Sequence, residues 1–231
     1  MMRAKPRSER EYTHQDHNKH MTNVYAYGII EQEDIELDID SVAGASNVYT
    51  VDYKTLSAIV SDIDTTEPER TDEDVERHNE VLRTVMEHGD GRTVVPMSFG
   101  MAFKDTRTLK GVIRGARRAF RKALNDVDGT IELGVKLLAS DPEAVDGDAV
   151  REDVDQRLGD HCINETDNDL FSDRLVLNKS YLVDRAEQGA FDDAIDEIEA
   201  EYEDDLIVQY TGPWAPYNFV DIHIGADKGG G

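Results

Sequence analysis

The chain contains 231 residues, with 50 Asp and Glu against 25 Lys and Arg, which gives a formal net charge of −25. This length suits one large domain or two small ones. No apolar run approaches the roughly 18 residues that a membrane span needs, no signal peptide is recognisable, and the single cysteine, Cys162, excludes an intrachain disulfide. We therefore expect a cytoplasmic protein that does not bind a membrane.

The acidic residues are spread along the whole chain rather than gathered in one tail. A large net charge keeps a protein soluble. In molar salt the Debye length falls to about 3 Å, so the mutual repulsion of these charges is screened. The composition therefore favours adaptation to high salt over the alternative interpretation, which is repulsion of nucleic acid. In a halophilic protein the net charge says little about its partners.

Residues 1–20 differ from the rest because they are basic and show no apolar periodicity. His14, His17 and His20 recur at every third position, which raises the possibility of a metal site. A flexible basic tail explains the same composition more simply, and this is the interpretation we adopt.

Strands and helices alternate through the rest of the chain, with hairpins between some of the strands. Period-two patterns and short apolar runs predict strands, and apolar residues three and four positions apart predict helices. In chain order the predicted elements are a strand at 24–30, an acidic loop at 31–45, a hairpin at 47–60, a helix at 71–89, an irregular strand at 94–103, a helix at 106–127, a strand at 130–138, a weak helix at 143–158, a strand at 174–183, a helix at 187–202 and strands at 206–210 and 217–224.

This order of elements predicts an α+β fold with mixed or antiparallel sheets, and two tandem ferredoxin-like domains fit it best. We expect an N-terminal α+β domain over 21–139 and the core of a C-terminal α+β domain over 174–226. An acidic junction with a weak helix would separate them at 140–173, and a flexible end would follow at 227–231.

Motifs for catalysis, cofactors and metals are missing from the sequence. Neither of the glycine-rich loops that cradle phosphates occurs, and the Asp-Gly pair at 128–129 lacks the ligands of a calcium loop. His161 and Cys162 are adjacent, so their side chains diverge on any regular element, and an idle thiol is expected. His78 lies on an apolar helix face and is expected to be a satisfied core histidine, whereas His223 is expected on a strand surface. We expect no catalytic residue, cofactor or metal.

The predicted helix at 106–127 carries a cluster of basic residues that the features described so far do not explain. Seven of the 25 basic residues fall within positions 107–122, several of them opposite the apolar stripe. A solvated face that complements acidic neighbours in the same protein is one interpretation, and a docking surface for an acidic partner is the other. Nucleic acid ranks third, since no stacking aromatics accompany the arginines. The candidate partner-binding residues of this helix are Arg114, Arg117, Arg118 and Arg121.

The segment TGPWAPYNFV at 211–220 gathers the only tryptophan of the chain and two of its six prolines. Proline cannot donate to a sheet ladder, so this segment must be an edge, a bulge or a crossover. Trp214 either plugs the core between the domains, in which case Trp214→Ala costs about 3–5 kcal/mol, or anchors a partner. Trp214 and Tyr217 are therefore candidate partner-binding residues.

Six segments in order and register resemble one family. These are VYAYGII, TDEDVERHNEVL, RTVVPMSFGMAF, TIELGVKLL, LNKSYLV and TGPWAPYNFV, spread over about residues 22–225. They resemble the gas vesicle accessory proteins of the GvpF/GvpL type, the haloarchaeal F branch most of all. Many relatives carry Arg where this chain has Ser98, so a role of that arginine does not carry over.

The resemblance implies a non-catalytic accessory protein with two ferredoxin-like α+β domains, a minor component of gas vesicles. It would bind the small hydrophobic shell protein and other accessory proteins, and help to nucleate or build the vesicle. A ligand sensor with a small molecule between its domains is the alternative, and an RNA-binding protein that uses the basic helix is a weaker one. We expect partners that are proteins, with no nucleic acid among them.

Overall fold

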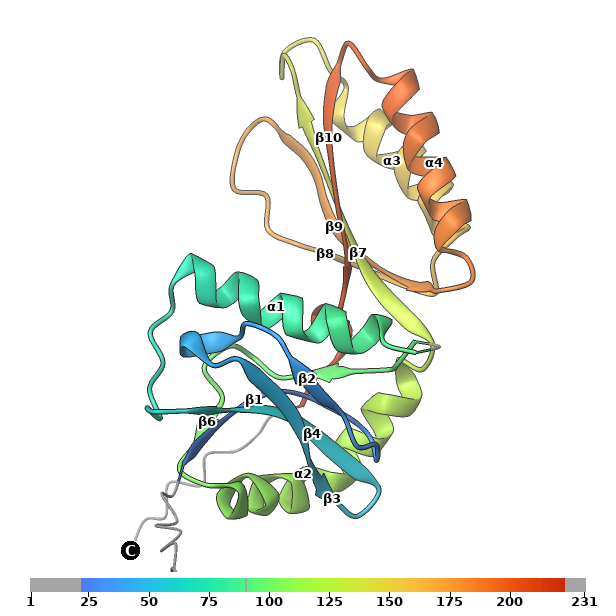
Figure 1. Cartoon of the computed structure of the whole chain (residues 1–231). Coiled ribbons are helices and arrows are strands. Elements are labelled where there is room, and N and C mark those ends of the chain that lie inside the picture. Colours follow the sequence, from blue (N-terminus) through green and yellow to red (C-terminus); the bar gives the residue numbers. More distant parts are fainter. Residues whose placement is uncertain (1–21, 90, 223–231) are drawn as a thin grey trace, which may run out of the picture.

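The computed structural model describes residues 22–89 and 91–222, and it consists of two α+β units (Figure 1). Six strands form the sheet of the first unit: β1 (Asn23–Glu31), β2 (Glu36–Asp38), β3 (Asn47–Tyr53), β4 (Leu56–Ile63), β5 (Val95–Pro96) and β6 (Ala102–Phe103). Their order is β2-β3-β4-β1-β5, with β6 also paired to β1. A short 3-10 helix, η1 (Val42–Gly44), follows β2, so the expected acidic loop contains two short elements.

The second unit is a four-stranded sheet covered by two helices. Its elements are β7 (Thr130–Ala139), α3 (Gly147–Gly159), β8 (Asn164–Asp167), β9 (Leu175–Asp184), α4 (Gln188–Glu201) and β10 (Leu206–Trp214). The strand order is β10-β7-β9-β8, and every pairing in both sheets is antiparallel. The expected α+β class with antiparallel sheets is confirmed.

The sheet topology differs from the expected domain division at one strand. We expected residues 130–139 to close the first domain, but β7 lies between β9 and β10 and pairs with both. The following 140–173 segment is not a junction, because α3 and β8 belong to the second sheet and its helix layer. Residues 130–139 directly follow the helix expected at 106–127, which suggested that they belong to the first domain. Antiparallel strands can pair at any separation along the chain, so this proximity did not identify the right sheet.

Two helices cover the two faces of the first sheet, α1 (Asp72–Glu87) on one side and α2 (Thr106–Asp126) on the other (Figure 1). The Thr71 hydroxyl accepts the backbone N–H of Asp74 and so caps α1. The Asp105 carboxylate caps α2 in the same way by accepting the N–H of Thr108. Such caps satisfy backbone donors that the first helical turn leaves free.

The buried apolar side chains form two clusters. The smaller one fills the space between the first sheet and α2, and Ile29, Ile113 and Phe120 belong to it. The larger one runs from the α1 face of the first sheet into the second unit, where α3 and α4 pack on one face of the second sheet. A continuous core therefore joins the two units through α1, which lies between them (Figure 1).

The chain after β10 returns to the first unit. Gly212 has φ +122, and a Cβ there would lie 2.9 Å from the carbonyl oxygen of Glu132, so only glycine fits this turn. The strand expected at 217–224 is wrong for its first part, because Tyr217–Phe219 forms a 3-10 helix, η2. Phe219, Val220 and Ile222 then pack against the cluster under α2. This C-terminal segment thus covers a core that lies about a hundred residues earlier in the sequence.

Within the described residues, no helix is long and apolar enough to cross a membrane. The expected tail at 1–20, His223 and the expected flexible end at 227–231 lie outside the residues that the structure describes.

Candidate functional site

A cavity of about 410 Å³ opens where the two units meet. Its walls come from the segment before α1, from α1 itself, from the segment between β5 and β6, from β7 and from the C-terminal segment. The lining residues are Arg70, Val75, His78, Asn79, Ser98, Phe99, Glu132, Trp214, Tyr217 and Asn218. Two of the candidate residues, Trp214 and Tyr217, are thus brought together here. We call this space the junction cavity.

A hydrogen-bonded network centred on His78 connects both units at the cavity. The His78 side chain is 2% exposed. Its Nδ1 lies 2.8 Å from the Tyr25 hydroxyl, and its Nε2 lies 3.1 Å from the carbonyl oxygen of Met97 and 2.8 Å from the Tyr217 hydroxyl. The expected satisfied core histidine is confirmed.

One assignment of protons satisfies the whole network. Because the Met97 carbonyl only accepts, Nε2 carries the His78 proton. Nδ1 then accepts the Tyr25 O–H, while Tyr25 accepts the backbone N–H of Gly100, and Tyr217 donates to Asn79 at 3.2 Å. Burial lowers the pKa of His78 to about 4, and the nearby Arg70 charge adds to this, against the opposing effect of the hydrogen bond to Met97. The imidazole is therefore neutral at pH 7.

A buried carboxylate holds the C-terminal segment against the second sheet. Glu132 is 5% exposed, and its two oxygens accept the backbone N–H of Asn218 at 2.9 Å and the Asn218 Nδ2 at 2.6 Å. The Asn218 amide also donates to Ser180 at 3.0 Å. Charge-assisted hydrogen bonds are among the stronger hydrogen bonds in proteins, so Glu132 holds Asn218 in place at the cavity wall.

Trp214 is half-buried and lies beside Glu132 between two cavities. The second cavity, of about 160 Å³, lies on the helix-free face of the second sheet and shares Glu132 and Trp214 with the junction cavity. Trp214 belongs to neither cluster of buried side chains. The sequence left open whether Trp214 plugs the core between the domains or anchors a partner, and the structure places the indole in the wall of the cavities. The expectation that this segment is an edge, a bulge or a crossover is confirmed, because β10 is an edge strand with a register shift between Thr211 and Trp214.

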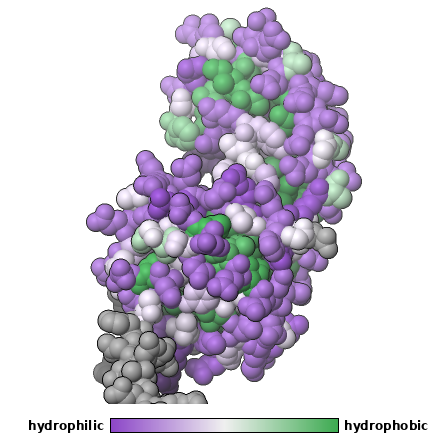
Figure 2. Space-filling view, viewed as in Figure 1, coloured by the Kyte–Doolittle hydropathy of each residue, from purple (hydrophilic) through white to green (hydrophobic). Residues whose placement is uncertain are grey.

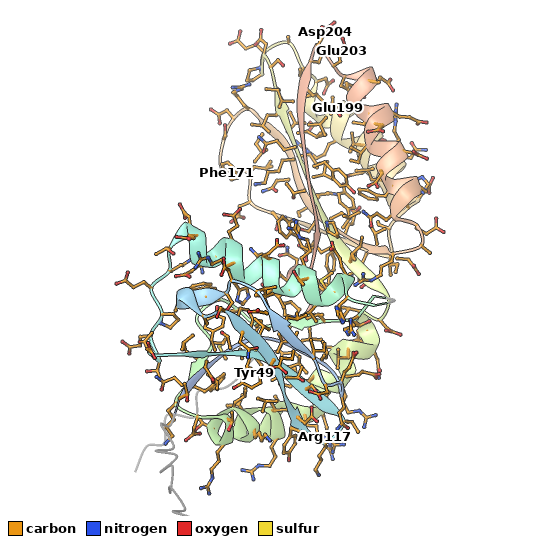
Figure 3. All side chains as sticks on the ribbon, viewed as in Figure 1. Tyr49, Arg117, Phe171, Glu199, Glu203 and Asp204 are labelled. Atoms are coloured by element: carbon orange, nitrogen blue, oxygen red, sulfur yellow. The ribbon has the colours of Figure 1, made fainter. Side chains whose placement is uncertain are left out.

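Exposed apolar side chains gather in the second unit. Among the described residues, the large exposed ones are Ile163, Leu170, Phe171 and Ile207. Phe171 is 73% exposed, and Lys136 Nζ lies 5.6 Å from its ring centroid. Figure 3 shows Phe171 on the loop that precedes β9, and Figure 2 shows apolar patches on an otherwise largely hydrophilic face. Lys136 also lines the second cavity, so Phe171 lies near this cavity, while Trp214 forms part of its wall.

The candidate residues of α2 lie elsewhere. Arg114, Arg118 and Arg121 are exposed, whereas Arg117 is half-buried with its Nε atom out of contact with solvent. Figure 3 shows Arg117 at the end of the molecule opposite the second unit. The structure therefore divides the predicted site residues into two separate surfaces.

The surroundings of Lys179 and Cys162 in the second unit favour a structural role for both side chains. Lys179 Nζ lies 2.8 Å from Asp155 and from Glu165, and burial of the ammonium is outweighed by these carboxylates, so the pKa of Lys179 is raised. Burial likewise raises the pKa of the Cys162 thiol, the opposite of what an activated nucleophile needs. Within the described ranges, no group of three His, Cys, Asp or Glu side chains is placed to hold a metal ion.

Sequence reasoning missed four residues of these surfaces: Arg70, Glu132, Asn218 and Phe171. Glu132 carried a signal, since a lone acid in the apolar strand TIELGVKLL needs a partner. Phe171 carried another, since Leu170 and Phe171 interrupt an acidic segment. Arg70, whose guanidinium lies 5.4 Å from the Phe99 ring centroid, carried none.

The arrangement of the whole chain matches solved structures of one kind. The crystal structure of gas vesicle protein GvpF from Anabaena superposes with a TM-score of 0.78 at 17% identity, over 87% of this chain and 97% of that one. GvpF from Microcystis aeruginosa gives 0.77 at 16% identity, over 87% and 100%. The chain thus shares its two-unit α+β fold with these two GvpF structures.

Sequence comparison agrees with the fold. The family model for gas vesicle synthesis protein GvpL/GvpF matches residues 23–152 and 144–221, and the chain belongs to this family. Gas vesicle protein F of Haloferax mediterranei is 71% identical over 89% of this chain and 97% of its own length. Gas vesicle protein F1 of Halobacterium salinarum is 68% identical over 89% and 96%. The expected resemblance, to the haloarchaeal F branch, is confirmed.

Proposed function

We propose that this chain is a non-catalytic gas vesicle accessory protein that binds the small hydrophobic shell protein. It would also bind other accessory proteins, assist or nucleate assembly in the cytoplasm, and remain in the gas vesicle as a minor component. A shell protein exposes apolar surface before it polymerises, and such surface aggregates unless it is covered.

The observation that carries this proposal is a pair of aromatic side chains near the helix-free face of the second sheet, the half-buried Trp214 and the exposed Phe171, which we call the aromatic surface. Trp214 is held in the wall of the junction cavity beside the turn at Gly212, and Phe171 is largely exposed. Aromatic side chains with restricted motion are favoured anchors in protein interfaces. In molar salt apolar contacts persist while surface ion pairs weaken, so this surface suits a hydrophobic partner.

Co-expression with the shell protein in molar KCl tests the proposal. We expect the chain to co-purify with the shell protein and to raise the amount that stays soluble. Trp214→Ala and Phe171→Ala are expected to lower the recovered shell protein several-fold. No association of the folded wild-type chain would contradict the proposal.

Tyr49→Ala provides a matched control, because Tyr49 is a half-buried aromatic of the first unit (Figure 3). We expect this variant to retain the shell protein like the wild type. If all three variants lose binding equally while they stay folded, the aromatic surface is not the contact.

A second candidate is a sensor with a small molecule in the junction cavity, supported by the volume and polar lining of that cavity. It is the weaker candidate because His78 and Glu132 are already bonded to protein groups. Fluorescence of Trp214, the only tryptophan, would report a bound molecule directly.

We also infer that the second unit is ferredoxin-like, because its elements follow the βαββαβ order. In the first unit α1 follows four strands and α2 follows six, so the inference concerns the second unit alone.

A further inference from the structure

The helix α2 carries positive charge on one side along most of its length. Between positions 107 and 122 it contains seven Lys and Arg and no Asp or Glu. Lys122 pairs with Asp126 one turn further on. The exposed basic side chains are Arg107, Lys110, Arg114, Arg118, Arg121 and Lys122. We call this the basic face.

The helix α4 carries the opposite charge in the same one-sided way. Its residues 188–201 contain six Asp and Glu and no Lys or Arg. Phe191, Ala194, Ile195 and Ile198 are buried against the second sheet, so the acidic residues lie on the outer side. Asp193, Asp196, Glu197 and Glu199 are exposed. We call this the acidic face.

The two faces lie at opposite ends of one molecule. Figure 1 shows α2 at the lower end and α4 on the upper unit, and Figure 3 shows Arg117 at the lower end and Glu199 at the upper one. One chain therefore cannot bring its own faces together. A second copy can supply the acidic face that the basic face lacks.

We propose that copies of this chain associate head to tail, with α2 of one copy against α4 of the next. The two patches in such a contact differ, so the contact is heterologous and leaves one unused face at each end. Association then continues into rings or open chains. This inference concerns copies of the chain itself and does not depend on binding of the shell protein.

The salt concentration determines whether two copies of this acidic chain can approach each other. Each copy carries a net charge of −25, which opposes association over long distances at low salt. In molar salt the Debye length is about 3 Å, so the long-range repulsion is screened more strongly than the attraction between opposite charges in direct contact, which is weakened as well.

Light scattering with sedimentation velocity in molar KCl, over a wide range of protein concentration, tests the proposal. The mass of the wild type is expected to rise beyond that of a dimer. Two double variants each remove one face: Arg114→Glu with Arg118→Glu removes the basic face, and Asp193→Arg with Glu197→Arg removes the acidic face. Each variant alone is expected to associate at least tenfold more weakly than the wild type.

An equimolar mixture of the two variants gives the decisive result. Each variant keeps one native face, and the two reversed faces are again opposite in charge, so the mixture is expected to recover association beyond a dimer. The control Glu67→Arg with Glu69→Arg makes the same charge change as the acidic-face variant, in an exposed loop before α1, and is expected to associate like the wild type. Circular dichroism confirms that every variant is folded.

Three outcomes would overturn the proposal. The first is a wild type that stays monomeric at all concentrations. The second is a folded variant that associates as well as the wild type, which would place the contact elsewhere. The third is a mixture that stays monomeric, which would show that the basic and acidic faces do not pair.

Discussion

The two sheets of the molecule differ in what covers their second face. In the first unit α1 and α2 cover both faces, and each side has an apolar core. In the second unit α3 and α4 share one face, and the other face carries buried polar residues, among them Glu132, Asn178 and Ser180. That face is covered by the C-terminal segment and by the loop before β9, through hydrogen bonds rather than apolar contact.

This difference shows how one chain covers its two sheets by different means. A face covered by a helix gains from apolar burial. A face covered by a few polar contacts leaves a cavity, a half-buried Trp214 and an exposed Phe171 at its margin. The aromatic residues that we propose to bind the shell protein therefore lie where the covering of the second sheet is incomplete.

The largest expected effect comes from breaking the apolar cover of the first sheet. Phe120 is 1% exposed on α2, and Phe120→Ala should lower the free energy of unfolding by about 3–5 kcal/mol. Denaturation in fixed molar KCl measures this, with Trp214 fluorescence and circular dichroism as two probes. The transitions should coincide, because the C-terminal segment joins both units. Separate midpoints would show that the units unfold independently.

Removing the polar contacts that cover the second sheet should lower the free energy of unfolding by a smaller amount. Glu132→Ala removes the acceptor of two hydrogen bonds from Asn218 and should cost about 1.5–3 kcal/mol. A double-mutant cycle with Asn218→Ala isolates the pair, and the two changes should be less than additive by about 1 kcal/mol. Strict additivity would mean that Glu132 does not hold the segment.

The junction network should add a dependence on pH to the stability. The pKa of His78 is about 4 in the folded chain and about 6.5 when unfolded, so the unfolded state binds more protons between these values. The contribution of the neutral His78 to the free energy of unfolding is fully present above pH 6.5. It is lost as the pH falls, and the free energy of unfolding is lower by about 2 kcal/mol at pH 5. Chemical denaturation of the wild type and of His78→Gln between pH 5 and 8 measures it. Equal pH slopes in both would contradict the assignment.

The sequence predicted local structure well where periodicity was strong. The helices α1, α2 and α4 were expected within a few residues of their bounds, since apolar residues three and four apart leave few alternatives. The hairpin of β3 and β4 and the place of His78 were expected for similar reasons. The family was predictable because its motifs keep their order along the chain.

The candidate site was predictable only in part. Trp214 and Tyr217 were expected together, but their neighbours Arg70 and Glu132 come from two other segments of the chain. No local pattern connects such residues. The same limit explains why the sequence left open whether Trp214 lies in the core or in an interface, since a single aromatic residue does not reveal which surface it faces.

By itself, then, the sequence determined the charge of the protein, its helices and strands and its family, because composition, periodicity and motif order are properties of the chain. Only the tertiary structure decided that β7 joins the second sheet, that the C-terminal segment returns to the first unit, and that the basic and acidic helices lie at opposite ends. These depend on which distant segments bury surface against each other, and that choice is made by the packing of the whole chain.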